Sequence, residues 1–293
     1  MIVINLTGGM GNQMFQYAFG KSLSLRSKVI MKTNFTDALF CTTRNYSLDC
    51  FEITSLPANT KEIKKSGFPT NKLGRIIYRI SKTINLSALL YPKVISEINI
   101  NRITTQNKLD NIYLEGFWQK EKYFNKYKKE IQKEFSFRKK ISKKNATLLK
   151  KINNTNSVAI HIRRGDYVTN PEVKKIFNVC GKDYYDKAIN YITKNVNNPT
   201  FFIFSEDEIW AKENLQPKLR PIFIHSRTDW EDMYLISKCK YNIIANSSFS
   251  WWAAWLNRNK NKIILAPKNW TSRATSDELE IVPKKWVKIE NIS

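Results

Sequence analysis

Residues 157–167 read Ser157-Val158-Ala159-Ile160-His161-Ile162-Arg163-Arg164-Gly165-Asp166-Tyr167. The apolar part of this stretch predicts a buried strand, and two adjacent arginines and a glycine follow it directly. In α/β proteins ligands bind where parallel strands end, so these arginines would bring fixed positive charge to a binding site. His161 lies on the same period-2 face as Arg163. The stretch predicts an α/β fold with a site for a phosphorylated ligand, whereas the alternative is solvated charge at a strand end.

The composition and the net charge limit which classes of protein the chain can belong to. A chain of 293 residues is long enough for two domains, and its 42% hydrophobic and 13% aromatic residues exclude a disordered chain. The formal net charge, 49 − 25 = +24, predicts an acidic partner, which is nucleic acid, an anionic membrane surface or a phosphate-rich ligand. Charge alone does not choose among them, and a lysine-rich codon bias would produce the same excess.

Cysteine usage and hydropathy indicate the compartment. Cys41, Cys50, Cys180 and Cys239 have no CxxC spacing, so they predict free thiols in a reducing compartment and no zinc site. No stretch approaches the roughly 18 apolar residues of a membrane span. These features predict a cytoplasmic protein whose basic surface allows peripheral contact with the anionic inner face of the cytoplasmic membrane.

Both halves of the chain alternate strands with helices. The first half opens with a strand over 2–6, a glycine loop over 7–13 and a helix over 14–25, although its G-G-x-G spacing is not the dinucleotide fingerprint. A charged helix is predicted over 123–135. A boundary in the lysine-rich segment 139–156 predicts domains 1–150 and 151–293. The second half predicts strands over 158–162, 201–204, 222–224, 241–245 and 263–265, separated by helices over 184–193, 230–238 and 250–256. The pattern predicts two Rossmann-like, doubly wound domains facing across a cleft.

Polar residues follow three of the predicted strands in the second half. They are His161, Arg163 and Arg164, then Ser205, Glu206 and Asp207, then Asn246, Ser247 and Ser248. Arginine can neutralise a diphosphate without a metal, a carboxylate can accept hydrogen bonds from guanine, and a helix N-terminus offers amide donors to phosphate. The last group also fits an ordinary helix N-cap. Trp251, Trp252 and Trp255 have the helical spacing of core residues, and Asp229, Glu231 and Asp232 suit the start of a helix better than a metal site.

Four motifs in order carry a resemblance to a known family. They are Gly8-Gly9-Met10-Gly11-Asn12-Gln13-Met14-Phe15-Gln16-Tyr17-Ala18, His161-Ile162-Arg163-Arg164-Gly165-Asp166-Tyr167, Phe204-Ser205-Glu206-Asp207 and Asn246-Ser247-Ser248-Phe249-Ser250-Trp251-Trp252-Ala253-Ala254. This series resembles the α-1,2-fucosyltransferases of glycosyltransferase family 11, and Leu114–Gln119 looks like a fifth motif. The segment 41–92 resembles the family least, and acceptor specificity is expected to vary there.

The resemblance implies a GT-B fold and an enzyme that moves L-fucose from GDP-β-L-fucose to the 2-hydroxyl of a terminal β-galactoside, with inversion and without an essential metal. The acceptor would be a galactose-terminated oligosaccharide or a lipid-linked glycan in surface polysaccharide or O-antigen synthesis. Domain 1–150 would take the acceptor side, and domain 151–293 would bind GDP-fucose.

The resemblance also implies roles for single residues. Arg163 would hold the β-phosphate as GDP leaves, His161 would lie against the nucleotide, and Arg164 would fix the loop or a phosphate. Ser205 with Glu206 or Asp207 would read guanine. Further donor contacts would come from Gly11, Asn12 and Gln13 and from Asn246, Ser247, Ser248 and Phe249. Asp166 and Glu115 are the candidate general bases, although Asp166 also fits a structural role bracing the arginines.

Two other functions compete with this interpretation. A glycosyltransferase for a different nucleotide sugar would use the same scaffold, because the residues that select fucose are not separable from those that hold GDP. A non-catalytic, basic RNA-binding protein would need aromatic side chains interleaved with lysines in a recognition motif, and no such motif occurs in the sequence. The sequence therefore predicts no nucleic-acid partner.

Overall fold

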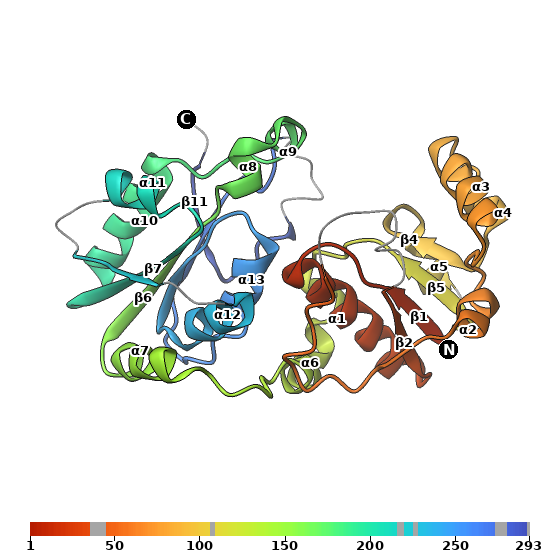
Figure 1. Ribbon diagram of the computed structural model, residues 1–293, viewed down its shortest axis with the longest axis horizontal. Coiled ribbons are helices and arrows are strands. Elements are labelled where there is room, and N and C mark those ends of the chain that lie inside the picture. Colours follow the sequence, from red (N-terminus) through yellow and green to blue (C-terminus); the bar gives the residue numbers. More distant parts are fainter. Residues whose placement is uncertain (36–44, 106–108, 216–219, 225–227, 273–279, 292–293) are drawn as a thin grey trace. The chain divides into compact units, whose positions relative to one another are not determined.

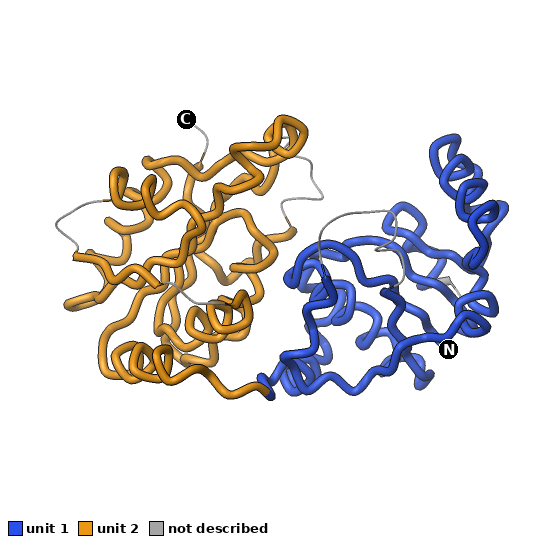
Figure 2. The backbone as a smooth tube through the Cα atoms, viewed as in Figure 1, with its two compact units in different colours: residues 1–138 blue, residues 139–293 orange. Residues whose placement is uncertain are grey.

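The computed structural model describes residues 1–35, 45–105, 109–215, 220–224, 228–272 and 280–291. The chain forms two compact units, Met1–Arg138 and Lys139–Ser293 (Figure 2). The boundary after Arg138 comes earlier in the chain than the predicted boundary after residue 150. The reason is that helix α7 (Lys143–Asn153) belongs to unit 2, where it packs against β6 and α12. Cys41 lies outside the described residues. Cys50, Cys180 and Cys239 are free, as predicted, and all three are buried.

Unit 1 is built on one parallel sheet in the order β3-β2-β1-β5-β4 (Figure 1). Its strands are β1 (Ile2–Asn5), β2 (Met31–Asn34), β3 (Leu56–Pro57), β4 (Val94–Ser96) and β5 (Ile112–Glu115). Its helices are α1 (Met10–Ser27), α2 (Thr60–Lys65), α3 (Lys72–Thr83), α4 (Ser87–Leu90), α5 (Asn101–Thr105) and α6 (Lys128–Glu134). The central strand β1 is buried throughout and, apart from Asn5, apolar, as expected of a strand with a neighbour on each side and helices on its faces.

Two helix starts in unit 1 differ from the prediction. Helix α1 begins at Met10 and not at Met14, because Gly8 turns the chain at φ +76° and the Gly9 carbonyl already accepts a hydrogen bond from the Gln13 amide, at 3.1 Å. The predicted charged helix over 123–135 begins only at Lys128. The short 3₁₀ turns η3 (Glu121–Tyr123) and η4 (Asn125–Tyr127) precede it.

Unit 2 carries a parallel sheet in the order β11-β10-β9-β6-β7-β8. Its strands are β6 (Asn156–Ile162), β7 (Pro199–Ser205), β8 (Ile222–Ile224), β9 (Tyr241–Ile243), β10 (Ile264–Pro267) and β11 (Val287–Ile289). Its other helices are α8 (Gly165–Thr169), α9 (Pro171–Ile176), α10 (Lys182–Asn195), α11 (Glu208–Asn214), α12 (Asp229–Lys238) and α13 (Ser248–Trp255). The chain runs outward from β6 through β7 to β8 and then returns to β9 on the other side of β6. The switch in strand order between β6 and β9 is where a doubly wound sheet binds its ligand.

Two further sequence predictions for unit 2, the buried tryptophans and the acidic helix start, are confirmed. Trp251, Trp252 and Trp255 are buried, and the ring centroids of the first two lie 5.1 Å apart. The acidic residues at the start of α12 lie in its first turn, where the helix dipole favours them, and Glu231 accepts a hydrogen bond from the Ser142 amide, at 2.7 Å. Within the described part of the chain, every helix is too short or too polar to span a bilayer.

Candidate functional site

The three polar motifs of unit 2 meet at one edge of its sheet. Strand β6 pairs with β7 on one side and with β9 on the other, both in parallel. The segments 163–166, 205–207 and 246–249 therefore leave the same edge next to one another. Figure 1 shows α8, α11 and α13 following these strands. The edge includes the switch point between β6 and β9, so the motifs converge where the fold favours a ligand.

Arg163 is held by two carboxylates. Its Nη1 donates to Glu206 Oε2 at 2.9 Å, its Nη2 donates to Asp166, and its guanidinium carbon lies 5.4 Å from the centre of the Tyr167 ring. Burial lowers the pKa of Arg163, but the neighbouring Glu206 and Asp166 outweigh burial and raise it. The guanidinium is therefore a fixed, permanent cation, and two of its five N–H donors are used by these carboxylates.

Arg164 is fixed separately from Arg163. Its Nε donates to Asp207 Oδ2 at 2.9 Å, and its guanidinium carbon lies 4.4 Å from the centre of the Trp210 ring. The Arg164 amide donates to Glu206 Oε1 at 2.9 Å, so Glu206 holds both arginines. The backbone of Gly165 makes room for this carboxylate, because an added Cβ would lie 2.9 Å from Glu206 Oε1.

The residues after β7 are bonded within the protein. Asp207 caps α11 by accepting from the Trp210 amide at 3.1 Å, while its own amide donates to Ser205 Oγ at 2.9 Å. The pKa of Asp207 is lowered, first by this amide hydrogen bond and then by Arg164. Glu206 and Asp207, one of which was predicted to read guanine with Ser205, thus each hold an arginine in this structure.

His161 lies on β6 and is 8% exposed. The centroid of its ring lies 5.5 Å from the centroid of the Phe249 ring. Its Nδ1 is buried without a hydrogen-bond partner. Burial, and secondarily the charge of Arg163, lowers the pKa of His161 from 6.5 to about 3. The imidazole is therefore neutral at physiological pH and supplies no charge to an anionic ligand.

This neutral histidine predicts a pH dependence of stability. Below about pH 6.5 the unfolded chain binds a proton at His161, whereas the folded chain does not. The contribution of the neutral His161 to the free energy of unfolding is therefore complete above that pH and is lost as the pH falls toward 3. The loss between pH 6.5 and 5 should be about 2 kcal/mol. Urea unfolding of wild type and His161→Phe at these pH values measures it. An equal loss in both proteins would contradict the assignment.

The loop before α13 is held by the buried side chain of Asn246 and leads to the backbone amides at the start of the helix. The Asn246 side chain donates to the Asn178 and Trp270 carbonyls, at 2.7 and 2.8 Å, so it supports the loop from inside. Ser247 is the N-cap residue of α13, but its side chain makes no capping hydrogen bond, so the predicted capping hydroxyl is absent at this position. The amides of Ser248 and Phe249 lie at the N-terminus of the helix, where the dipole favours an anion.

The donor contacts predicted in the first half of the chain, Gly11, Asn12 and Gln13, lie in the first turn of α1. Gln13 is buried and donates to the Gly8 and Asn45 carbonyls, at 2.8 and 2.9 Å, so it braces two loops. Asn12 accepts from Gln119 Nε2 at 2.9 Å. Gln16, which the sequence reasoning missed, joins β1 to β5 because it accepts from the Thr7 amide and donates to the Gly116 carbonyl. Its place in the quoted motif was the available signal.

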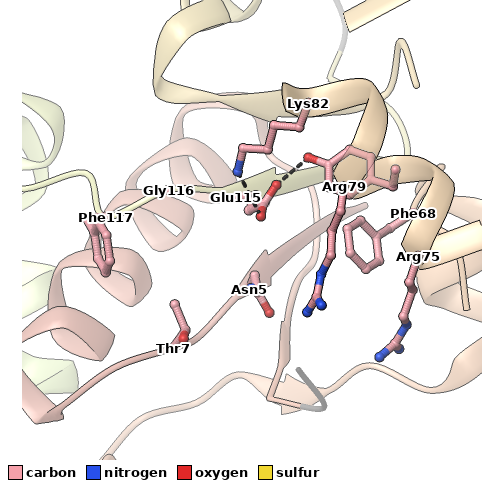
Figure 3. A pocket seen from close by; sticks show the side chains of 10 residues that line it. Asn5, Thr7, Phe68, Arg75, Arg79, Lys82, Glu115, Gly116 and Phe117 are labelled. Carbon is pink, nitrogen blue, oxygen red and sulfur yellow. Dashed lines mark hydrogen bonds and ion pairs between the residues drawn. The ribbon is translucent and has the colours of Figure 1, made fainter. Parts of the chain in front are cut away.

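Glu115 lies in a cavity of about 400 Å³ in unit 1 (Figure 3). The carboxylate accepts from the Tyr78 hydroxyl and from Lys82 Nζ, the latter at 3.2 Å. Arg75 and Arg79 extend from α3 on the same wall, and the other lining residues are Asn5, Thr7, Phe68, Gly116 and Phe117. Sequence reasoning named no site residue in α3, which carries four of the lining residues and lies in the segment 41–92, where acceptor specificity was expected to vary.

The described residues also bear on metal binding. Among them, no group of three or more His, Cys, Asp or Glu side chains could hold a metal ion. The charged groups at the β6 edge are arginines paired with carboxylates, which is a donor set for an anion and not for a cation.

The two parallel, doubly wound units define a glycosyltransferase scaffold of GT-B type. The fold is similar to that of fucosyltransferase NodZ from Bradyrhizobium, with a TM-score of 0.55 at 13% identity over 86% of this chain and 91% of that one. The model of glycosyltransferase family 11 matches residues 1–290, and the chain belongs to that family. Family membership, fold and motif order agree.

Two Escherichia coli relatives match almost the whole chain. An alpha-1,2-colitosyltransferase is 37% identical over 99% of this chain and 99% of its own. The O-antigen biosynthesis glycosyltransferase WbnK is 32% identical over 97% of this chain and 99% of its own. These similarities extend across both units.

Proposed function

We propose that this glycosyltransferase moves L-fucose from GDP-β-L-fucose to the 2-hydroxyl of a terminal β-galactoside, with inversion, during bacterial surface polysaccharide or O-antigen synthesis. The motif series, the family and the two bacterial relatives support the proposal. The observation that carries it is Arg163, a braced cation at the switch point of unit 2. The acceptor is a galactose-terminated oligosaccharide or lipid-linked glycan, and the reaction takes place in the cytoplasm at the inner membrane face.

In this mechanism Arg163 binds the β-phosphate. Negative charge grows on the phosphate oxygen as its bond to the anomeric carbon breaks, and a guanidinium already fixed in position stabilises that charge without reorganising. Glu206 and Asp166 use two of its N–H donors and leave the others for the diphosphate. The open amides at the start of α13 supply further donors to the diphosphate.

The carboxylates take separate roles in the proposal. Asp166 is bonded to Arg163, and we assign it to positioning that arginine. Glu115 lies in unit 1, where Lys82 holds it beside a cavity of sugar-binding size, and it is the candidate base for the acceptor hydroxyl. Gly11 and Asn12, in the first turn of α1, are proposed donor contacts, while buried Gln13 supports their loop.

A second donor is favoured by the relative of 37% identity, whose name specifies colitose transfer. Colitose is fucose without one ring hydroxyl. An active site that hydrogen-bonds that hydroxyl would reject colitose strongly, and an apolar one would accept both sugars with a smaller preference. The same scaffold and the same GDP contacts would serve either donor.

The test is release of the nucleoside diphosphate with and without lactose, in excess EDTA: GDP from GDP-fucose, GDP-colitose or GDP-mannose, and UDP from UDP-galactose. We expect lactose-dependent release from GDP-fucose that EDTA does not suppress. Release from GDP-colitose alone would replace the donor and keep the scaffold. If no GDP-sugar is turned over and GDP does not raise the melting temperature, the assignment of unit 2 to GDP binding is wrong.

A further inference from the structure

Helix α3 turns its apolar side outward. Five apolar residues at helical spacing form one stripe, here called the α3 apolar face, and they comprise Leu73, Ile76, Ile77, Ile80 and Ile84. Leu73 is 65% exposed and Ile80 is 56% exposed. An ordinary surface helix buries such a stripe against the core. The neighbouring helix α4 adds Leu89, which is 76% exposed, and exposed Leu86 and Leu90.

The opposite side of α3 anchors it in this orientation. Tyr78 and Ser81 are buried, and the Tyr78 ring packs edge-on against Phe68 and Tyr91. The Tyr78 hydroxyl donates to Glu115 at the end of β5. These contacts hold the helix at the periphery of unit 1, where Figure 1 shows α3 and α4 together. The exposed stripe is therefore a fixed feature of the fold.

A basic row lies beside the apolar face. Lys72, Arg75, Arg79 and Lys82 occupy the remaining side of the helix. From Ile63 to Ser96 the sequence contains seven Lys or Arg residues and no Asp or Glu. An apolar stripe flanked by cations is the arrangement of helices that lie in the interface of an anionic bilayer.

The charge also argues against a second copy of the chain as the partner. A symmetric dimer would place the same patch on both subunits and bring two such basic segments together. Like charges at close range oppose that contact, whereas anionic lipid headgroups satisfy the cations and the acyl boundary takes the apolar side chains.

We propose that α3 and α4 form a membrane-docking surface that lies in the headgroup region of an anionic bilayer. Three members of the basic row, Arg75, Arg79 and Lys82, also line the cavity that holds Glu115, so a docked enzyme would present this cavity close to the lipid surface (Figure 3). Exposed apolar side chains and neighbouring cations support this docking surface, and neither observation depends on the identity of the donor sugar.

Flotation with vesicles tests the proposal, using phosphatidylcholine alone and an equal mixture with phosphatidylglycerol. Wild type should bind the anionic vesicles only. Ile76→Gln/Ile80→Gln should bind at least about tenfold more weakly, and Lys72→Gln about fivefold more weakly. The matched control, Ile30→Gln/Ile209→Gln, changes two isoleucines outside this surface that are more exposed than Ile76 and Ile80, and it should bind like wild type.

Three outcomes would overturn the proposal. Wild type could ignore anionic vesicles, or Ile76→Gln/Ile80→Gln could bind as tightly as the control pair. Lipid-free sedimentation could instead reveal a wild-type dimer that this double variant abolishes, which would make a second copy the partner. Circular dichroism checks folding, and turnover of lactose should persist in the double variant, so a failed docking test is separable from a failed functional assignment.

Discussion

Replacing Arg163 with lysine should reduce sugar transfer by about a hundred- to a thousandfold, the usual effect of losing one preorganised donor group. Lysine keeps the positive charge but cannot make the forked contacts with Glu206 and Asp166. The two carboxylates would lose their shared partner, and the remaining ammonium would lie off the phosphate position. Steady-state release of GDP measures the effect.

The control for this substitution is Arg26→Lys, which changes an exposed arginine in the last turn of α1. It should leave turnover at the wild-type level. Because Arg163 is partly buried, melting temperatures are compared as well. Turnover of Arg163→Lys within a few-fold of wild type, in a protein that melts normally, would remove Arg163 from the mechanism.

Glu134→Ala should destabilise unit 1 by about 3–5 kcal/mol, the cost of breaking a buried ion pair from one side. Glu134, near the end of α6, is 7% exposed. It accepts from Tyr17 at 2.6 Å, from the amide and hydroxyl of Thr54, both at 2.7 Å, and from Lys21 at 2.7 Å. Its removal would leave these donors and the Lys21 charge unpaired around a cavity. Urea unfolding measures the loss.

The control is Glu130→Ala, an exposed acidic residue on the same helix, which should change stability by less than about 0.5 kcal/mol. Burial raises the pKa of Glu134, but Lys21, Tyr17 and Thr54 outweigh burial and lower it. Its stabilising contribution is therefore present above the unfolded carboxyl pKa and is lost as the pH falls through the folded value. Equal stability of the two variants would refute this role.

Local sequence patterns predicted most elements of unit 2. Apolar runs such as 158–162 and 222–224 and the periodic segment 230–238 form the expected strands and helix, because their side chains have the right period for a buried sheet or helix. Prediction failed at the ends of elements. The start of α1 depends on backbone geometry at Gly8 and Gly9, and the start of α6 on two preceding 3₁₀ turns.

The contacts within the candidate site could be predicted only in part. The sequence placed Arg163, Glu206 and Asn246 at strand ends, but it gave no information on which strands were neighbours. Pairing of β6 with both β7 and β9 brings them to one edge. The hydrogen bonds of Glu206 and Asp207 to the arginines were not predicted, since 42 residues separate Arg164 from Glu206 and only the folded sheet joins them.

Residue identity and short-range spacing are sufficient to specify the alternation of strands and helices, the order of the motifs, the family and the basic charge. Tertiary structure alone decided the strand order, the pairing of Arg163 with Glu206 and the burial of Glu134. It also decided that the apolar face of α3 points outward. The physical reason is that periodicity specifies which residues share a face, whereas long-range contacts determine whether that face meets the core or the solvent.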